Sequence, residues 1–308
     1  MINVFIDGQA GTTGLQLKNK LLNHPYVKLL EIDGDKRKDT DERKRLMNES
    51  DVVFLCLPDE AAKEAVKLVD NPDTVVIDAS TAHRTNDEWS YGFPELSSDH
   101  YNNIKKSKRI ANPGCHATGF ISIIYPLVSG GIMPKNYPVT AHSITGYSGG
   151  GNKMIGEYEK ENREYFYKSP RQYGLTQTHK HLPEMVKVTG LETTPVFNPI
   201  VADYYCGMAV SVPIFTNLLK VKMSVYELKR YFIEFYKDSK FITVHSGPEN
   251  GFLPATGLEG TNNLRIYICG NDERVTITAV FDNLGKGASS AAIENMNIAM
   301  GFDEATGL

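Results

Sequence analysis

Short apolar runs alternate with amphipathic segments along the first third of the chain. The apolar runs lie at residues 2–8, 27–33, 51–59 and 74–80. The segments between them lie at residues 12–24, 40–50 and 60–70. These intervening segments have the spacing or the composition of helices. Apolar strands that alternate with helices are typical of a parallel sheet covered on both faces, so a doubly wound α/β domain is predicted here.

The pattern changes after Cys115. An apolar stretch at residues 117–132 predicts a helix that ends at glycines. Residues rich in β-formers follow at 138–148, 196–215, 264–270 and 274–282, with further helices predicted at 224–238 and 289–302. These runs predict a second domain with a mixed, largely antiparallel sheet. The glycine-rich segment 145–170 is the longest predicted loop, and long loops are often functional.

Composition limits the kind of partner and the compartment. Of the 308 residues, 33 are Lys or Arg and 37 are Asp or Glu, which gives a net charge of −4. This balance argues against a nucleic-acid or membrane-surface partner. No basic leader with an apolar core opens the sequence, and no apolar run approaches the roughly 20 residues of a membrane span. The four cysteines lack the spacing of zinc sites and the density of a disulfide framework, so we expect a reducing cytoplasm and no bound metal.

A glycine-rich loop, "DGQAGTTG", follows the first predicted strand. Its glycines stand at GxxGxxG spacing before a helix, where backbone N–H groups can approach a pyrophosphate. The candidate cofactor contacts in this loop are Gly8, Ala10, Gly11, Thr12, Thr13 and Gly14. The spacing is a variant of the dinucleotide fingerprint, and an ordinary glycine-rich turn is the alternative.

The end of the second predicted strand bears on the choice between NAD and NADP. Asp33 stands where a carboxylate would accept a hydrogen bond from a ribose 2′-hydroxyl. Lys36, Arg37 and Lys38 follow at once, and such a cationic cluster suits a 2′-phosphate. We therefore expect NADP(H). The alternative is that these residues are only the solvated start of a helix.

The stretch "NPGCHATG" places Cys115 after a Pro-Gly turn and at the start of the apolar helix. Unpaired N–H groups at a helix N-terminus favour the thiolate, so Cys115 is the candidate nucleophile. Gly114, Ala117 and Gly119 are small and leave room for a substrate. His116 follows directly, but successive residues of a helix point in different directions. We therefore expect a packing or loop contact for His116.

The stretch "THKHLPEM" offers a better base for this thiol. If it is extended, His179 and His181 lie on one side, and Glu184 can orient one of the two rings. Either imidazole could activate Cys115 and later donate a proton, and the spacing does not decide between them. The alternatives are a surface cluster or a metal-binding pair, although no third ligand is evident.

Five motifs together resemble the short form of the N-acetyl-γ-glutamyl-phosphate reductase family. They are "FIDGQAGTTGLQL", "NPGCHATG", "SITGYSGGG", "HKHLPEM" and "DNLGKGASSAAIENMN", and the resemblance runs from residue 4 to the C-terminus. The NPGC turn is shared with related acyl-phosphate and semialdehyde reductases. The HxHxPE motif and the "NLGKGAS" segment make the resemblance more specific. The residue after the nucleophile is commonly aromatic in the family, so His116 is a departure.

The resemblance implies a fold like that of glyceraldehyde-3-phosphate dehydrogenase. A Rossmann-type NADP-binding domain would comprise residues 1–114 and 286–308, and a catalytic and dimerising α+β domain would comprise residues 115–285. It also implies a reaction, in which NADPH reduces N-acetyl-L-glutamyl 5-phosphate to the 5-semialdehyde and phosphate through a thioester on Cys115. This is the third step of arginine biosynthesis. The implied partner is a small acyl phosphate, and a homodimer or homotetramer is expected.

Further site residues follow from the motifs. The additional cofactor contacts would be Ser80, Asn283, Lys286 and Gly287. The substrate or phosphate contacts would be Asn112, Ser148, Gly149, Gly150 and Arg171. Backbone donors of the loop after Tyr147 could hold the leaving phosphate, and a plain flexible loop is the alternative.

Three other functions remain as alternatives. A sister enzyme for another acyl phosphate, such as aspartyl phosphate or a carrier-bound intermediate of lysine synthesis, would share the catalytic motifs. A non-catalytic redox sensor would bind the dinucleotide and use Cys115 as its sensing thiol. A cysteine hydrolase is disfavoured by the glycine loop, because hydrolysis needs no dinucleotide.

Overall fold

The computed structural model describes every residue from 1 to 308, and the chain divides into two compact units. The first unit comprises Met1–Gly114 and Ala288–Leu308, and the second comprises Cys115–Gly287. The sequence predicts that residues 286–308 belong to the first domain, so the predicted boundary lies two residues before the observed one. Lys286 and Gly287 therefore belong to the second unit.

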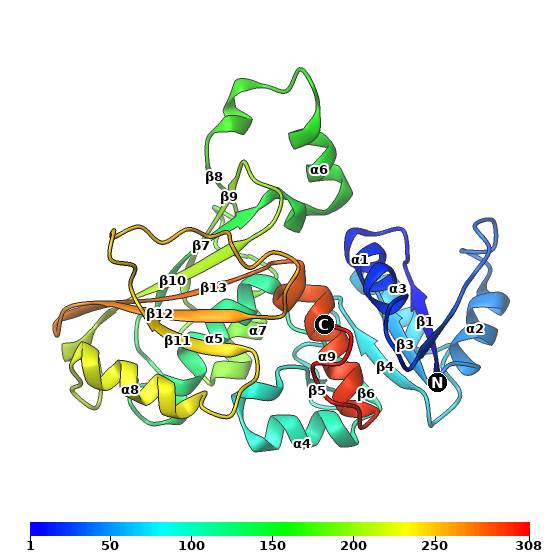
Figure 1. Cartoon of the computed structure of the whole chain (residues 1–308), viewed down its shortest axis with the longest axis horizontal. Helices are drawn as coiled ribbons and strands as arrows, with labels where there is room; N and C mark the ends of the chain where they lie inside the picture. The colour runs from blue at the N-terminus through cyan, green and yellow to red at the C-terminus, as the bar shows by residue number, and fades with distance from the viewer. The chain divides into compact units, whose positions relative to one another are not determined.

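The first unit is built on a six-stranded sheet with the order β2-β1-β3-β4-β6-β5, in which all neighbouring strands are parallel (Figure 1). Its strands are β1 (Ile2–Asp7), β2 (Val27–Leu30), β3 (Val52–Leu55), β4 (Val75–Asp78), β5 (Ser90–Tyr91) and β6 (Arg109–Ala111). Its helices are α1 (Thr12–Leu21), α2 (Thr40–Asn48), α3 (Asp59–Val66), η1 (Pro94–Leu96), α4 (Ser98–Lys106) and α9 (Ser290–Ala299).

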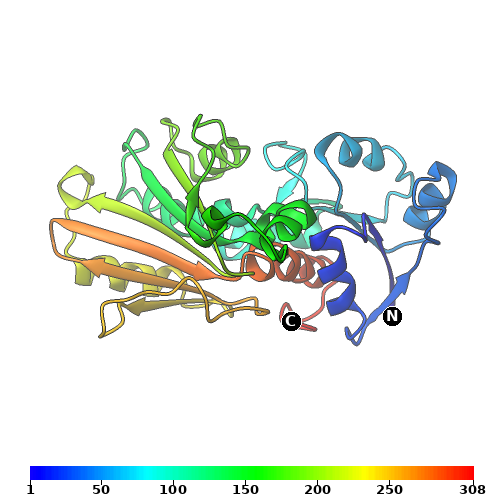
Figure 2. The same ribbon diagram turned by 90° about the horizontal axis from the view of Figure 1, so that it is seen from above.

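Helices cover both faces of this sheet. On one face, α1, α4 and α9 contribute Leu17, Leu21, Ile104, Ile293 and Met296 to the core. On the other face, α2 and α3 contribute Leu46, Met47, Ala62 and Ala65. The dark-blue α1 and the red α9 lie side by side in Figure 2. The prediction of a doubly wound parallel sheet is confirmed.

The glycine loop lies where the strand order of this sheet reverses. β1 is flanked by β2 and β3, so successive connections leave it in opposite directions. Ligands of open parallel sheets bind beyond the carboxyl ends of the strands at such a point. The predicted second strand is shorter than expected, because the chain turns after Leu30 and the N–H of Lys36 donates to the carbonyl of Asp33.

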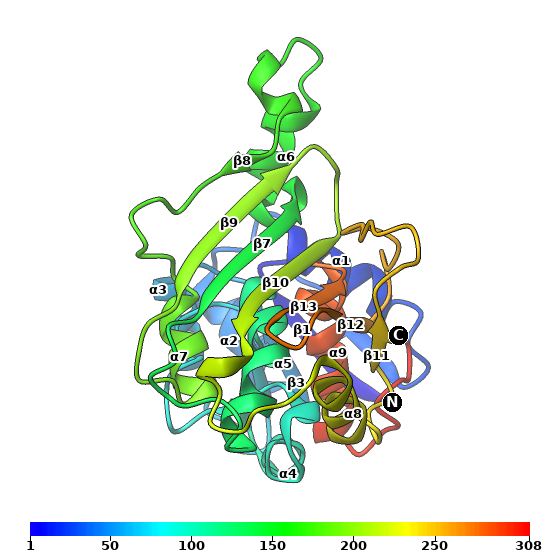
Figure 3. The same ribbon diagram turned by 90° about the vertical axis from the view of Figure 1, so that its left-hand side faces the viewer.

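The second unit contains a seven-stranded sheet with the order β11-β12-β13-β10-β7-β9-β8 (Figure 3). Its strands are β7 (Thr140–Gly146), β8 (Arg171–Gln172), β9 (Val196–Ala202), β10 (Met208–Phe215), β11 (Ile242–Ser246), β12 (Leu264–Gly270) and β13 (Arg274–Phe281). The pairs β11–β12 and β7–β9 are parallel and the others are antiparallel. The prediction of a mixed, largely antiparallel sheet is therefore confirmed.

The second unit also contains helices and short helical turns. They are α5 (Cys115–Ser129), η2 (Tyr147–Gly150), α6 (Gly151–Glu159), η3 (Tyr165–Lys168), α7 (Leu182–Thr189), η4 (Thr216–Leu218) and α8 (Val225–Phe235). A π-helical turn, η5 (Gly285–Ser289), leads into α9. α5 packs on β10 and β13 at very short range, since a Cβ atom on Gly119 would lie 2.5 Å from Val210 Cγ2.

Two expectations about this unit are wrong. The segment 145–170 is not a long loop, because it forms η2, α6 and η3, which extend away from the sheet of their own unit (Figures 1 and 3). The stretch 178–185 is not extended, because α7 begins at Leu182. Pro183 and Glu184 occupy the first turn of α7, where proline and acidic side chains favour a helix start.

Besides α6 and α7, the sequence pattern did not predict α4, β5, β8 and β11. β5 and β8 have two residues each, and α4 and β11 each carry a single buried side chain, Ile104 and Ile242. No helix of the structure is both long enough and apolar enough to cross a membrane.

Candidate active site

Cys115 is the first residue of α5 and is half-buried. Gly287 packs directly against it, since a Cβ atom at that position would lie 2.9 Å from Cys115 Cβ. A side chain at residue 287 would therefore displace the thiol. The site thus combines a helix N-terminal cysteine with a neighbour that must remain small.

His116 is buried behind Cys115 and uses both of its ring nitrogens. Its Nδ1 lies 2.6 Å from the Ser143 hydroxyl of β7, and its Nε2 lies 2.7 Å from the hydroxyl of Tyr173. Tyr173 follows β8, so His116 joins the helix start to a segment far along the chain. These contacts are of the packing and loop-contact kind that the sequence suggested.

His179 and His181 lie beside His116. The ring centroids of His179 and His181 are 4.8 Å apart, and the His116 ring lies 5.4 Å from His179 and 5.6 Å from His181. The Nδ1 of His179 accepts a hydrogen bond from the backbone N–H of His181 at 3.2 Å. The two imidazoles are therefore brought together, although not by the extended conformation that the sequence suggested.

Burial sets the ionisation of this cluster. It lowers the pKa of His116 to about 3, and the charges of His179 and Lys180 add to this effect. It lowers the pKa of His179 to about 4, again with a contribution from Lys180. Burial raises the pKa of Tyr173 above its ordinary value, and negative charge on Cys115 raises it further. His116 and His179 are consequently neutral at pH 7, and Tyr173 keeps its proton.

Glu184 is buried in the first turn of α7, the helix for which His181 is the N-cap. A carboxylate is favoured at a helix N-terminus by the partial charges of the unpaired N–H groups. Its position at the same helix end as His181 is compatible with the predicted orienting role, which stays a prediction.

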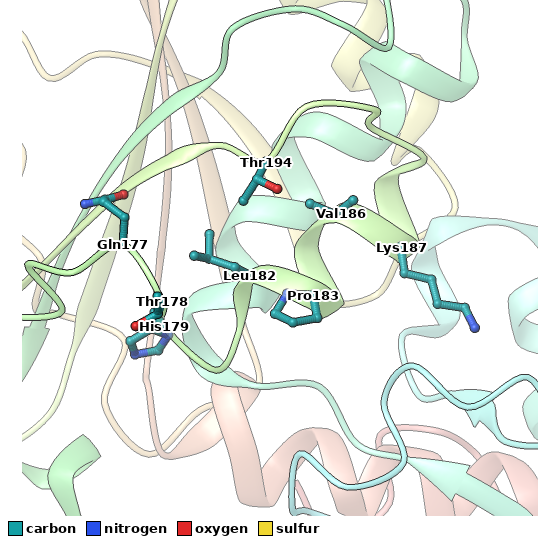
Figure 4. A pocket seen from close by; sticks show the side chains of 8 residues that line it. All are labelled: Gln177, Thr178, His179, Leu182, Pro183, Val186, Lys187 and Thr194. Atoms are coloured by element: carbon teal, nitrogen blue, oxygen red, sulfur yellow. The ribbon is translucent and has the colours of Figure 1, made fainter.

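A cavity of about 460 Å³ opens beside this cluster (Figure 4). Its lining residues are Gln177, Thr178, His179, Leu182, Pro183, Val186, Lys187 and Thr194. Leu182, Pro183 and Val186 give it an apolar wall on α7, and Lys187 points away from that wall. Of the candidate catalytic residues, only His179 lines it.

The glycine loop of the first unit has the geometry that a pyrophosphate needs. Gly8 has a φ of 95°, and a Cβ atom there would lie 2.3 Å from the carbonyl oxygen of Cys56. A Cβ atom on Gly14 would lie 2.3 Å from the carbonyl oxygen of Gly8. Gly11 is the N-cap of α1, and no side chain caps the first turn of this helix. The loop therefore fits an anionic cofactor group at a helix N-terminus.

The other candidate cofactor contacts of this unit differ in their exposure. Lys36, Arg37 and Lys38 are exposed in the turn before α2. Ser80 is buried after β4, where its hydroxyl donates to Asp78 Oδ2 at 2.6 Å. Ser80 thus has a structural partner at the carboxyl end of a strand, and its cofactor contact stays a prediction.

Asn112 is held within the first unit. Its Nδ2 donates to the carbonyl of Ala288 at 3.0 Å, and its Oδ1 accepts from Asn295 Nδ2 at 3.1 Å. Its own carbonyl accepts from Arg84 Nε at 2.9 Å. The side chain of Asn112 therefore links the end of β6 to the segment that contains α9. Its amide is already hydrogen-bonded within the protein, which does not favour the predicted contact with substrate or phosphate.

The predicted phosphate loop is tied down in a similar way. Asn283 Nδ2 donates to the buried hydroxyl of Ser148 at 3.1 Å, and Asn283 Oδ1 accepts from the N–H of Gly207 at 2.8 Å. A Cβ atom on Gly149 would lie 3.4 Å from Asn283 Nδ2. The side chains of Asn283 and Ser148 hold η2 in place, and only the backbone of Gly149 and Gly150 is left as a candidate anion ligand.

Arg171 lies in an aromatic cage. Its guanidinium carbon lies 5.0, 5.3 and 4.3 Å from the ring centroids of Tyr158, Phe166 and Tyr167. Its Nε also donates to the hydroxyl of Tyr158 at 3.2 Å. Cation–π contacts of this kind stabilise the segment itself. This environment does not favour the predicted contact with a substrate carboxylate.

Lys286 is buried in the second unit. Its ammonium group lies 5.2 Å from the ring centroid of Phe241. Because the π-helical turn η5 contains both Lys286 and Gly287, this turn places one residue against Phe241 and the next against Cys115. π-helical turns are frequent at functional sites, and the predicted cofactor contacts of both residues stay predictions.

Sequence reasoning missed three residues at these sites. Ser143 and Tyr173 complete the hydrogen bonds of His116, and no spacing in the sequence connects either of them to Cys115. Arg43 of α2 donates to Asp7 Oδ2 at the end of β1, with 2.7 Å between Nη2 and the oxygen. No group of three or more His, Cys, Asp and Glu side chains has the arrangement of a metal site.

Two family models match the chain. The model described as semialdehyde dehydrogenase, NAD binding domain, matches residues 3–104. The model described as semialdehyde dehydrogenase, dimerisation domain, matches residues 115–283. The two matched ranges fall within the two units of the structure.

Solved structures of aspartate semialdehyde dehydrogenases have the same fold. The enzyme from Francisella tularensis superposes with a TM-score of 0.74 at 15% identity, over 97% of this chain and 100% of that one. The enzyme from Candida albicans, solved with NADP, gives a TM-score of 0.67 at 15% identity, over 97% of this chain and 98% of that one.

Relatives of much higher identity have a different name. N-acetyl-γ-glutamyl-phosphate reductase 2 of a Nostoc species is 40% identical over 99% of this chain and 98% of its own length. The protein of the same name in Pseudomonas putida is also 40% identical, over 99% of this chain and 98% of its own length. The chain belongs to the N-acetyl-γ-glutamyl-phosphate reductase family.

Proposed function

We propose that this chain reduces N-acetyl-L-glutamyl 5-phosphate to N-acetyl-L-glutamate 5-semialdehyde and phosphate, with NADPH as the reductant. The reaction is a step of arginine biosynthesis. The observation that carries the proposal is the position of Cys115 at the start of α5, in a unit that also gathers His116, His179 and His181. The full-length likeness to N-acetyl-γ-glutamyl-phosphate reductases supplies the substrate.

Cys115 acts as the nucleophile. Its thiolate attacks the acyl carbonyl of the substrate, the bond to the phosphate oxygen breaks, and phosphate leaves with its electron pair. A thioester on Cys115 remains. This covalent intermediate divides one difficult transfer into two easier steps. Backbone N–H groups in the first turn of α5 stabilise the oxyanion of each tetrahedral intermediate.

The bound dinucleotide, when reduced, supplies a hydride. After the thioester carbonyl has been reduced, the tetrahedral carbon collapses to the aldehyde, and Cys115 leaves as a thiolate. His179 and His181 lie beside His116, and one of the two handles the proton of this step. His179 offers an N–H donor, because its Nδ1 already accepts a bond from the backbone. The loop with Gly8, Gly11 and Gly14 holds the pyrophosphate of the cofactor.

The preference for NADP(H) over NAD(H) rests on Lys36, Arg37 and Lys38. They lie together in the turn after β2 and are exposed, so a 2′-phosphate can reach them. The relation to dimerising relatives supports a homo-oligomer, and the reducing cytoplasm is the compartment that suits a free catalytic thiol.

The decisive experiment runs the reaction in reverse. The protein is incubated with N-acetylglutamate semialdehyde, phosphate and NADP⁺, and the absorbance of the reduced nicotinamide is followed. NAD⁺ replaces NADP⁺ in a parallel reaction, and aspartate semialdehyde replaces the substrate in another. The proposal is supported if the reduction of the dinucleotide depends on phosphate and is faster with N-acetylglutamate semialdehyde than with aspartate semialdehyde. A flat absorbance trace with both dinucleotides contradicts the proposal.

Cys115→Ser provides the matched control. This variant should bind NADP⁺ like the wild type, because the glycine loop is unchanged, and should show no turnover. Turnover that persisted in Cys115→Ser would exclude the thioester route. Wild-type protein that binds NADP⁺ but never turns over would favour the redox-sensor alternative.

A further inference from the structure

Gln177 has a backbone conformation that is unusual for its residue type. Its φ is 58°, and every other residue with a positive φ is a glycine. The left-handed region is costly for a residue that has a Cβ atom, and residues held there are concentrated at functional sites. The N–H of Gln177 donates to the carbonyl of Gly174 at 3.0 Å and closes a turn. The surrounding structure must therefore hold Gln177 in this conformation.

The side chain of Gln177 provides this restraint. β8 ends at Gln172, so on that side β9 has no strand to pair with at Phe197. There the amide of Gln177 takes the place of a strand. Its Nε2 donates to the carbonyl of Phe197 at 2.9 Å, and its Oε1 accepts from the N–H of Phe197 at 2.9 Å. Only an amide side chain offers the neutral donor and acceptor that this pair of bonds requires.

Phe197 connects this restraint to the histidine cluster. Its side chain is buried, and the centroid of its ring lies 5.2 Å from that of His116 and 5.2 Å from that of His179. Both contacts are edge-to-face, an arrangement in which aromatic rings attract each other. The residue that Gln177 binds is therefore also the residue against which His179 packs.

His179 is held from both sides along the chain. Only Thr178 separates it from Gln177 (Figure 4). On its other side, the N–H of Leu182 donates to the carbonyl of His179 at 3.0 Å, and the N–H of His181 donates to its Nδ1 at 3.2 Å. The bonds of Gln177 complete this arrangement at the N-terminal side, where the chain leaves the edge of the sheet.

We propose that Gln177 is a positioning residue that fixes His179 in the histidine cluster, through the two hydrogen bonds between its amide and the backbone of Phe197. The proposal rests on the proposed function for the task of His179 as a donor. It gives a physical reason for the strained backbone of Gln177, because the left-handed turn brings the amide to β9 while the chain continues to His179. With the backbone held and the ring packed, the Nε2–H of His179 keeps one direction.

The test uses two substitutions of Gln177 and one of Gln172. Gln177→Gly removes both bonds but adopts the same φ without strain, so the turn is retained. Gln177→Glu keeps the size of the side chain and places a carboxylate oxygen against the carbonyl of Phe197, which breaks one of the two bonds. Gln172→Glu is the matched control, because Gln172 is exposed and its Nε2 donates to the side chain of Asn198 at 3.0 Å, and not to the backbone of β9.

The primary readout is the protonation of the His179 ring, followed by NMR of protein labelled in its histidines. His179→Gln assigns the signal. Burial lowers the pKa of His179 to about 4, and the charge of Lys180 adds to this effect. The other titratable groups around the ring are His116, His181 and Tyr173. A ring that leaves its packed position regains water, so its pKa rises toward its ordinary value. A role of Gln177 in overall stability alone would leave the pKa of the folded protein unchanged.

We expect the His179 ring of the wild type and of Gln172→Glu to stay mostly neutral down to about pH 5. Gln177→Gly should raise the pKa of His179 by about one unit or more, which is a tenfold rise in proton affinity, and Gln177→Glu should raise it in the same direction. In turnover, both Gln177 variants should lower kcat about tenfold or more, since a displaced donor is poorly aligned. The KM for NADPH should stay the same, because the glycine loop belongs to the other unit.

A rise in the pKa of His179 in either Gln177 variant, with none in Gln172→Glu, supports the proposal. Two results would overturn it. One is a His179 ring that stays neutral down to about pH 5 in both Gln177 variants. The other is an equal rise in Gln172→Glu, which would attribute the change to any disturbance of the sheet edge. If Gln177→Gly does not fold, Gln177→Glu decides in the same titration. Because the titration requires no turnover, a failure of the proposed reaction leaves this result readable.

Discussion

The Nδ1 of His179 accepts a hydrogen bond from the backbone N–H of His181, with 3.2 Å between the two nitrogens. This bond fixes the neutral His179 ring as the tautomer that carries its proton on Nε2. His179 therefore presents its Nε2–H as a hydrogen-bond donor. His181 takes part in this bond through its backbone N–H, so the bond does not fix the tautomer of the His181 ring. The two histidines of one short motif are thus chemically distinct.

Glutamine should separate their roles. The side-chain N–H of glutamine can replace a neutral Nε2–H donor but cannot take up and release a proton. His179→Gln should retain much more activity than His179→Ala, whose loss should be about a hundredfold or more, typical for an oxyanion donor. For His181, we expect the Gln and Ala variants to be equally impaired in kcat. Equal activities of His179→Gln and His179→Ala would contradict the donor assignment.

Acid should destabilise the protein through His116. Its pKa is about 3 in the folded protein, against an ordinary value of 6.5. The unfolded chain therefore binds a proton that the folded chain refuses, and stability is complete above about pH 6.5 and falls as pH drops toward 3. The slope from this one group is about 1.4 kcal/mol per pH unit. Urea unfolding at several pH values should show a shallower decline in His116→Gln, with the other histidines unchanged, and parallel curves would contradict this expectation.

Close packing at Gly119 should reverse the usual effect of alanine in a helix. Its Cβ would lie 2.5 Å from Val210 Cγ2 and 2.8 Å from Phe281 Cε1, so Gly119→Ala should lower the free energy of unfolding by about 1–3 kcal/mol. Gly156 in α6 has no atom within 4 Å of a built Cβ, and Gly156→Ala should raise stability by about 0.5–1 kcal/mol. Chemical denaturation of the two variants should give changes of opposite sign.

Cofactor choice should depend on the turn before α2. Replacing Lys36, Arg37 and Lys38 together by serine should raise the KM for NADPH about tenfold or more, since charged hydrogen bonds to the 2′-phosphate are lost. The KM for NADH should stay the same, which makes NADH the internal control. Unchanged KM values for both dinucleotides would show that the cluster belongs only to the solvated start of α2, and an equal rise in both would contradict a contact with the 2′-phosphate.

The fold could be predicted from the sequence because its signals are local. The strand β3 is apolar along its whole length, and β4 is apolar up to Asp78; their alternation with helices is sufficient to predict a doubly wound sheet. The turn chemistry around Cys115 also places the thiol at a helix start. β5 has only two residues and β11 buries only one side chain, so neither gives a pattern of apolar positions that the sequence can show.

The site could be predicted only in part, because its contacts are long-range. Tyr173 and Ser143 reach His116 across many residues, and no spacing in the sequence indicates their bonds. Conversely, Arg171 and Asn283 look like free polar groups in the sequence, but folding gives them partners nearby. Sequence motifs thus indicate the nucleophile and the glycine loop better than the residues that orient them.

The first unit is formed by two stretches of chain that are separated by the whole second unit, and this affects how the protein folds during its synthesis. The ribosome delivers β1 to β6 first, then all of Cys115–Gly287, and only at the end α9, whose Ile293 and Met296 close one face of the parallel sheet. The part of that face that α9 covers, beside α1 and α4, stays open while the second unit is synthesised. The second unit can fold before α9 arrives, because its chain is continuous. A chain that lacked its last twenty or so residues would have a complete second unit, but its first unit would expose apolar core residues and be prone to aggregation.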